Sequence, residues 1–208
     1  MNRINFEGFQ WINGWAEQFR LLDTVMTAIT HSVPYVAIAL MMFLWFSGNK
    51  DQVIKKRYTA LYAFISSLIA IFINAIIHFI YYHPRPFVVH HVHQLVPHAT
   101  DSSFVSDHAV LVFAIAWVLW IHNERLKVPV FIWATLVGIS RIYVGVHYPM
   151  DVIGSALLAF GTSLLVLYFS PKLEPLVRLY LHLYRFLSSL FPSGHNQEKQ
   201  DQERKHGV

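Results

Sequence analysis

Long apolar stretches restrict this chain to few folds. They run at about 21–46, 58–82, 106–121, 128–143 and 149–169 and contain few charged residues. A helix needs about 20 predominantly apolar residues to cross a bilayer, and each stretch meets or nearly meets that length. Charged residues make up 13% of the chain, compared with about 25% in soluble domains. The sequence therefore predicts an all-α integral membrane protein, a bundle of five to six transmembrane helices.

The first apolar stretch and the segment before it are irregular. Asp23, His31 and Pro34 lie in the first half of that stretch, and we expect the helix to break just before the proline. Ahead of it, residues 3–20 place aromatic side chains among polar ones at helical spacing. This pattern fits either an interfacial helix with tryptophans at the headgroup level or an ordinary helix packed on the bundle.

The positive residues predict an orientation. All but four of the 16 Lys and Arg residues fall in 50–57, in 125–127 or from 172 onward. With five spans these segments share one side of the membrane, and the positive-inside rule assigns that side to the cytoplasm. The N-terminal segment, the 83–105 loop and the segment 140–151 then face outward.

The end of the chain has two parts. Residues 171–191 are amphipathic but contain several charges, which favours a cytoplasmic interfacial helix over a sixth span. Residues 193–208 are polar, and we expect them to be disordered. We therefore divide the chain into a membrane domain at 1–170 and a cytoplasmic tail at 171–208. The first ten residues lack the apolar core of a signal peptide, so no removable signal is expected.

Two of the outward-facing segments contain groups suited to binding an anion. Prolines on both sides of Arg85 stiffen the backbone that carries its guanidinium, which suits bidentate recognition of a phosphate. Ser106 is a natural N-cap for the third apolar stretch, and a helix N-terminus offers free N–H groups to an anion. Asp107 and His108 follow in the first turn. The alternatives are an arginine that meets lipid headgroups and a capped helix with a structural histidine.

The third outward-facing segment places Arg141, His147 and Asp151 at spacings of six and four. Pro149 is a plausible first residue of the next helix, which puts Asp151 in its first turn. A carboxylate four residues from a histidine can accept from the imidazole and orient it. The alternative is an interfacial charge pair that stabilises a turn.

Together the three segments favour chemistry on a phosphate. Ionisable groups at membrane depth are functional by default. We expect the arginines and the helix N–H groups to hold phosphoryl oxygens, while one histidine attacks phosphorus and the other protonates the departing oxygen. A carboxylate would keep the attacking histidine in the required tautomer.

These motifs also resemble a known family. Arg85-Pro86, Ser106-Asp107-His108 and Ser140-Arg141 with His147 and Asp151 resemble the three signatures of the type 2 phosphatidic acid phosphatase superfamily. The likeness covers about residues 5–170. The sequence around the first two signatures is similar to that of bacitracin-resistance type undecaprenyl-diphosphate phosphatases. It implies that His147 is a nucleophile that forms a phosphohistidine and that Asp151 orients it. It also implies that His108 is the acid, that Arg85 and Arg141 bind the phosphate, and that no metal or cofactor takes part.

Three features depart from that family's pattern. His78 stands where the family has a lysine, seven residues before Arg85, so this phosphate contact becomes weaker and dependent on pH. Asp107 stands where the family usually has glycine, and we keep it as a candidate for handling a diphosphate. The segment Pro192-Ser193-Gly194-His195 spells the family's second signature. We reject it because it follows the third signature in the predicted cytoplasmic tail.

The resemblance implies a function at the outer leaflet of the cell membrane. The chain would convert undecaprenyl diphosphate to undecaprenyl phosphate, which recycles the carrier lipid of cell-wall synthesis and confers bacitracin resistance. Another lipid phosphate, such as phosphatidylglycerol phosphate, is an alternative substrate, and a non-catalytic lipid-binding or transport protein is an alternative function. The expected partners are a polyprenyl diphosphate lipid and the membrane, without nucleic acid. The crowded loop histidines lack a nearby Cys or Glu, which disfavours a zinc site; they are His83, His90, His91, His93 and His98.

Overall fold

The computed structural model describes residues 3–190, and within that range every regular element is a helix. The all-α prediction is therefore confirmed. The chain divides into two compact units, Met1–Tyr168 and Phe169–Val208. In chain order the helices are α1 (Arg3–Asn13), α2 (Arg20–His31), α3 (Val33–Phe46), α4 (Lys50–Ile80), α5 (Pro86–Val89), α6 (Asp107–Ile121), α7 (Lys127–Tyr143) and α8 (Pro149–Leu190).

Two helices in the described part are long and apolar enough to cross a membrane, at Gln52–Ile80 within α4 and at Pro149–Pro175 within α8. Helices α2 and α3 pass the same test together, with a bend of 51° between them. The bend follows His31 and confirms the predicted break, because Pro34 in the first turn of α3 cannot donate a backbone hydrogen bond. Helix α6 is apolar but shorter, at 15 residues. Length and composition thus give two spans, or three if the bent pair is one.

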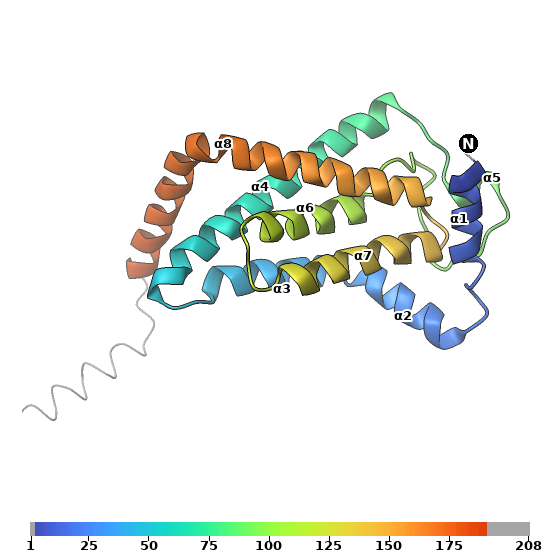
Figure 1. Cartoon of the computed structure of the whole chain (residues 1–208), viewed down its shortest axis with the longest axis horizontal. Helices are drawn as coiled ribbons and strands as arrows, with labels where there is room; N and C mark the ends of the chain where they lie inside the picture. The colour runs from blue at the N-terminus through green and yellow to red at the C-terminus, as the bar shows by residue number, and fades with distance from the viewer. Residues whose placement is uncertain (1–2, 191–208) are drawn as a thin grey trace, which may run out of the picture. The chain divides into compact units, whose positions relative to one another are not determined.

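Helix α6 lies at the centre of the first unit. Helices α3, α4 and α7 pack against it, and Figure 1 shows these helices lying side by side. Most of its side chains are buried, which accounts for its apolar composition, although Trp120 near its end is 45% exposed. Trp117 of this helix donates its indole N–H to the Ala156 carbonyl of α8 at 3.1 Å. The buried residues of α6 are Ala109, Val110, Val112, Phe113, Ala114, Ile115, Ala116, Val118 and Leu119.

A small group of buried hydroxyls joins α4 to the first half of α8. Ser66 Oγ lies 3.3 Å from Thr162 Oγ1 and 3.1 Å from Ser163 Oγ. Ser163 also donates to the Ala159 carbonyl at 2.8 Å, so each hydroxyl has a partner within the bundle. We call these three residues the hydroxyl cluster. Such bonds between helices are a common means of joining helices in apolar surroundings.

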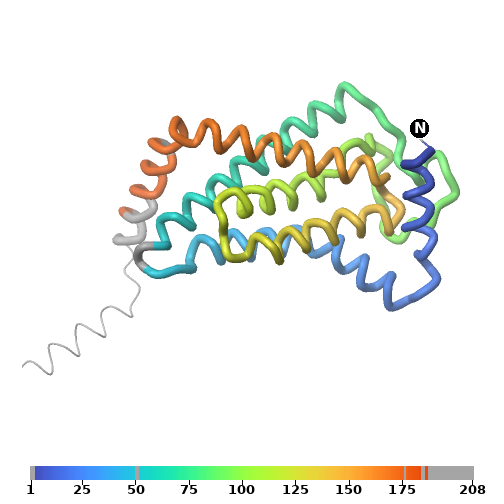
Figure 2. Tube along the Cα trace, viewed as in Figure 1, coloured from blue at the N-terminus to red at the C-terminus, as the bar shows by residue number. Residues whose placement is uncertain are grey.

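Helix α1 crosses one end of the bundle, beside α5 and the connection that leads to α6 (Figure 2). It ends at Asn13, earlier than the predicted helix at 3–20. The Asn13 amide donates to the His93 and Tyr143 carbonyls, both at 2.8 Å, and ties α1 to α7. Phe9 is buried, whereas Trp11 is 74% exposed. One face of α1 therefore packs on the bundle and the other is free.

Helix α8 begins at Pro149, as predicted, but continues to Leu190 rather than ending near 169. It contains Pro171 and Pro175. A proline removes a hydrogen bond and can kink a helix without ending it, so α8 continues through both prolines. The polar tail from 191 onward lies outside the described residues, and so does the rejected motif Pro192-Ser193-Gly194-His195.

Candidate active site

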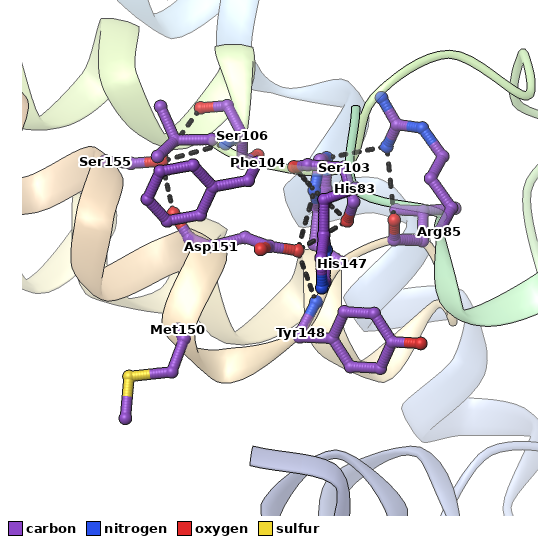
Figure 3. Close-up of polar contacts among 12 residues, drawn as sticks. His83, Arg85, Ser103, Phe104, Ser106, His147, Tyr148, Met150, Asp151 and Ser155 are labelled. Carbon is purple, nitrogen blue, oxygen red and sulfur yellow. Dashed lines mark hydrogen bonds and ion pairs between the residues drawn. The ribbon is translucent and has the colours of Figure 1, made fainter. Parts of the chain in front are cut away.

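The segments singled out by the sequence meet at the α1 end of the first unit (Figure 3). Arg85 immediately precedes α5, Ser106 immediately precedes α6, and His147 lies in the turn between α7 and α8. This turn depends on Gly145, whose φ of +84° suits glycine. A Cβ at that position would also lie 2.5 Å from the His93 carbonyl oxygen. The turn thus packs directly on the histidine-containing loop between α5 and α6.

The His147 imidazole is held at both nitrogens. Its Nδ1 lies 2.9 Å from the Ser103 carbonyl oxygen, and its Nε2 lies 3.0 Å from Arg85 Nη1. A carbonyl only accepts and a guanidinium only donates, so Nδ1 carries the proton and Nε2 keeps its lone pair. Burial lowers the pKa of His147 to about 3, and the two arginines add to this effect, while the nearby Asp151 carboxylate opposes it. The imidazole is therefore neutral at neutral pH, with Nε2 available as a nucleophile.

The Asp151 carboxylate lies on the opposite side of His147 from Arg85 (Figure 3). Its Oδ2 accepts from Ser103 Oγ at 2.5 Å and from the Tyr148 backbone N–H at 2.8 Å. The same oxygen is 3.6 Å from His147 Nδ1, which is an ion-pair distance and longer than a hydrogen bond. Asp151 thus lies beside His147, as predicted, but its hydrogen bonds go to the residues around the imidazole.

Arg85 is fully buried and only partly satisfied. Its Nε donates to Asp101 Oδ1 at 2.9 Å and its Nη1 to the Val146 carbonyl at 3.1 Å. Its Nη2 is buried with no hydrogen-bond partner among the described residues. Since a buried donor without a partner is costly, this nitrogen is suited to an incoming anion.

Arg141 and Ser106 present further buried donors. Arg141 Nη1 donates to Thr30 Oγ1 at 2.8 Å, while its Nε and Nη2 have no partner in the described structure. Ser106 occupies the predicted N-cap position of α6, but its Oγ makes no capping bond and has no partner within the described range. Its backbone N–H donates instead to Ser155 Oγ at 3.0 Å. The hydroxyl and both guanidinium nitrogens are thus available to a ligand.

His108 lies in the first turn of α6 and is half-buried. Both Arg85 and Arg141 act electrostatically on it, and they also act on His147. The two histidines therefore lie in the positive electrostatic field of the same two arginines. Asp107, the residue before it, is exposed, and its Oδ1 accepts from the Asn74 amide at 2.7 Å. This bond gives the aspartate a neutral partner on α4.

His78 lies next to the second segment. Its Nε2 is 2.9 Å from the Val105 carbonyl oxygen, and Asn74, one turn earlier on α4, bonds both the N–H and the carbonyl of Val105. Sequence reasoning missed Asn74, together with Ser103 and Thr30. Asn74 gave a usable signal, because it is a lone amide in an apolar run. Ser103 and Thr30 gave none, because serine and threonine are common in helices and loops of every kind.

The loop histidines are dispersed. His98 is the nearest to the site, with its ring centroid 6.1 Å from that of His147 and its Nδ1 3.7 Å from Asp101 Oδ1. Burial and the nearby Arg85 lower the pKa of His98. His93 instead pairs with Glu17 at 2.8 Å. No group of three or more His, Asp or Glu suited to a metal ion occurs among the residues that the structure describes.

Two adjoining, largely apolar cavities lie along α6, and the first includes His108 in its lining. The first, of about 300 Å³, has Asp107 and His108 at one side and Val33, Pro34, Ile71 and Leu111 around it. The second, of about 460 Å³, shares Pro34 and Leu111 with the first and extends between α3, α4 and α6. Its surface is almost wholly apolar. A groove of this kind suits a hydrocarbon chain attached to a polar group at the site.

Comparison with known sequences shows related proteins. The profile of the PAP2 superfamily matches residues 59–175. The chain is 38% identical over 181 residues to undecaprenyl-diphosphatase BcrC of Bacillus subtilis, and the aligned region covers 87% of this chain and 92% of that protein. It is 27% identical over 159 residues to the putative undecaprenyl-diphosphatase YbjG of Escherichia coli, covering 76% of this chain and 78% of that protein.

Solved structures give the same picture. The crystal structure of LpxE from Aquifex aeolicus superposes with a TM-score of 0.64 at 30% identity, covering 80% of this chain and 96% of that one. A PAP2 type phosphatidylglycerolphosphate phosphatase from Bacillus subtilis superposes with a TM-score of 0.58 at 24% identity, covering 82% of this chain and 88% of that one. The second likeness shows the shared fold alone.

Proposed function

This chain belongs to the PAP2 superfamily, and on that premise we propose that it is an undecaprenyl-diphosphate phosphatase, which releases the terminal phosphate of the lipid. The relative BcrC, which bears the name undecaprenyl-diphosphatase, matches it over most of its length. One observation supports the chemistry most directly. The neutral His147 presents its Nε2 lone pair toward Arg85, among buried donors that lack partners. A phosphoryl group would supply the acceptor oxygens that these donors need.

We assign the first step to His147. Its Nε2 lone pair forms a bond to the terminal phosphorus while the bond from phosphorus to the bridging oxygen breaks. Because Arg85 Nη1 lies 3.0 Å from Nε2, its guanidinium must move from the ring to the phosphoryl oxygens as substrate binds. Arg141 and Ser106 Oγ complete the anion site, and they stabilise the charge that develops on the oxygens.

His108 is the proposed general acid. It would donate its proton to the bridging oxygen, so that undecaprenyl phosphate leaves without developing excess negative charge. The resulting neutral imidazole would then take a proton from the water that attacks the phosphohistidine, and this step releases phosphate and restores His147. Asp107 and His78 are proposed to face the diphosphate from the α4 side.

The apolar groove beside His108 favours a lipid over a soluble phosphate ester. The diphosphate would lie between the two histidines, and the first isoprene units would follow the groove between α3, α4 and α6. The rest of a long polyprenyl chain would extend into the surrounding lipid. A substrate with this geometry reaches the site from within the membrane plane.

We propose five spans, with α2 and α3 forming one broken span and α4, α6, α7 and the first half of α8 forming the others. On the positive-inside rule, the site would then lie at the outer leaflet of the cell membrane, with α1 at the interface. Recycling of the carrier lipid at that surface would compete with bacitracin for undecaprenyl diphosphate and so confer resistance. The segment 171–190 is proposed to lie at the cytoplasmic interface.

Purified protein in detergent tests the proposal. We expect phosphate release from undecaprenyl diphosphate in the presence of EDTA, and we expect His147→Ala to abolish it. His91→Ala is the matched control, because His91 is an exposed histidine between α5 and α6 with no assigned role, and the variant should retain wild-type activity. Release that persists in His147→Ala would refute the assignment of the nucleophile.

The same assay separates the alternatives. Binding of the lipid without release by the wild-type protein would support a carrier function. Faster release from phosphatidylglycerol phosphate than from undecaprenyl diphosphate, compared at equal concentrations by kcat/KM, would change the substrate but keep the mechanism.

A further inference from the structure

Ser103 connects all three parts of the site. Its side chain is fully buried, its backbone N–H donates to the His83 carbonyl at 2.7 Å, and its carbonyl accepts from His147 Nδ1 at 2.9 Å. Its hydroxyl donates to Asp151 Oδ2 at 2.5 Å. One residue thus binds the segment before Arg85, the nucleophile and the carboxylate.

The distances rank the contacts around the imidazole. The Ser103 carbonyl is 0.7 Å closer to His147 Nδ1 than Asp151 Oδ2 is, because the two separations are 2.9 Å and 3.6 Å. The carboxylate oxygen nearest the imidazole already accepts two short bonds, from Ser103 Oγ and from the Tyr148 N–H. An oxygen with two donors in place has little capacity left for a third.

We propose that Ser103 is a positioning residue for the nucleophile and that Asp151 acts on His147 through it. The Ser103 carbonyl keeps the proton on Nδ1, which leaves the lone pair on Nε2. The carboxylate holds the Ser103 hydroxyl, and this bond fixes the peptide whose carbonyl orients the ring. When Nε2 bonds to phosphorus the imidazole becomes cationic, and Asp151 then stabilises the charge from 3.6 Å without receiving the proton.

This arrangement differs from direct orientation by the carboxylate in a testable way. If Asp151 oriented His147 directly, removal of the Ser103 hydroxyl would free Oδ2 to approach Nδ1, and the nucleophile would be held at least as well. If Asp151 instead orients His147 through Ser103, removal of the Ser103 hydroxyl loosens the orientation of the His147 ring in the same way as removal of the carboxylate. The effects of Ser103→Ala and Asp151→Asn would then be non-additive.

The kinetic test rests on the proposed function and uses undecaprenyl diphosphate. We expect Ser103→Ala to lower kcat about 10- to 100-fold with KM changed less than about threefold. The double variant with Asp151→Asn should be scarcely slower than Asp151→Asn alone. Ser102→Ala is the matched control, because its hydroxyl bonds the Tyr81 carbonyl and contacts no reacting group. Wild-type kcat in Ser103→Ala, or additive losses in the double variant, would overturn the proposal.

A spectroscopic test on the wild-type protein is independent of turnover. In wild-type protein labelled with ¹³C at the Ser103 carbonyl, the Nδ1–H of His147 should show scalar coupling to that carbon through the hydrogen bond. Its ¹⁵N shifts should report a single tautomer with the proton on Nδ1, and His147→Gln identifies the signals. Coupling to the Asp151 carboxyl carbon instead, or a proton on Nε2, would overturn the proposal. A protein that shows the coupling but releases no phosphate would refute the proposed function and leave the positioning intact.

Discussion

The first unit contains two groups of buried polar side chains, and they differ in how completely they are satisfied. In the hydroxyl cluster between α4 and α8, each of Ser66, Thr162 and Ser163 has a partner inside the protein. At the site end, several buried donors and acceptors have none. Within the described residues these atoms are His83 Nδ1, Arg85 Nη2, His90 Nε2, Ser106 Oγ, Arg141 Nε and Nη2, and Tyr148 OH.

The difference separates a structural polar group from a functional one. A buried polar atom without a partner is disfavoured by about 1–3 kcal/mol, so a bundle retains one mainly where a water, an ion or a ligand satisfies it. The hydroxyl cluster has no such capacity left and can only join helices. The site end keeps its capacity on two arginines and on the Ser106 hydroxyl just before α6, and guanidinium groups bind phosphate readily.

Among the variants that test this comparison, Arg141→Ala should cause the largest loss of activity. The variant removes two unpartnered buried nitrogens that we assign to the phosphoryl oxygens, and kcat/KM for undecaprenyl diphosphate should fall about 10³-fold. Arg141→Lys should recover little, because an ammonium cannot replace a bidentate guanidinium. Steady-state phosphate release measures both. A fall smaller than tenfold in Arg141→Ala would show that its unpartnered atoms do not face the substrate.

His108→Ala should have the next largest effect, about 10²-fold in kcat, because a general acid contributes on that order. The loss should shrink below about tenfold with p-nitrophenyl phosphate, whose leaving group needs no proton. His98→Ala is the matched control, since His98 lies near the same arginines but is not assigned the proton transfer. Equal losses on both substrates would mean that His108 binds the phosphate rather than protonating the leaving oxygen.

The buried nucleophile should also make stability depend on pH. Burial lowers the pKa of His147 to about 3 in the folded protein, whereas the unfolded value is about 6.5. His147 in its neutral form thus contributes to the free energy of unfolding. This contribution is fully present above pH 6.5 and is lost as pH falls toward 3, because only the unfolded chain gains the proton in that range. At pH 5 the loss is about 2 kcal/mol. Denaturant unfolding in detergent at pH 7.5 and 5 should show this loss in the wild type and not in His147→Gln; equal losses would contradict the burial of a neutral imidazole.

The sequence predicted the fold where local signals and tertiary packing agree. The break before Pro34 and the start of α8 at Pro149 are confirmed, because proline acts through its own backbone. The end of α8 could not be predicted, since Pro171 and Pro175 stand inside a helix whose continuation they do not prevent. The end of α1 was missed because aromatic spacing persists beyond Asn13.

The site was predictable as a set of residues but not as a set of contacts. Spacing placed His147 and Asp151 within one turn, and the structure brings them within 3.6 Å. It could not show that Ser103, from a loop 44 residues earlier, lies against both. Nor could it show that Asp107 would be held by Asn74 from another helix. Contacts of this kind depend on how the loops fold back on the bundle.

The same type of substitution, serine to alanine, made in both regions tests the comparison most finely. Ser66→Ala removes a satisfied hydroxyl, so the free energy of unfolding should fall by about 0.6 kcal/mol while kcat stays within about twofold of wild type. Ser106→Ala removes an unsatisfied hydroxyl, so stability should be unchanged or slightly higher while kcat falls about tenfold. Denaturant unfolding and phosphate release on the two variants measure both quantities. If Ser106→Ala lost stability and kept its activity, the unpartnered groups at the site end would be structural, and the contrast between the two regions would fail.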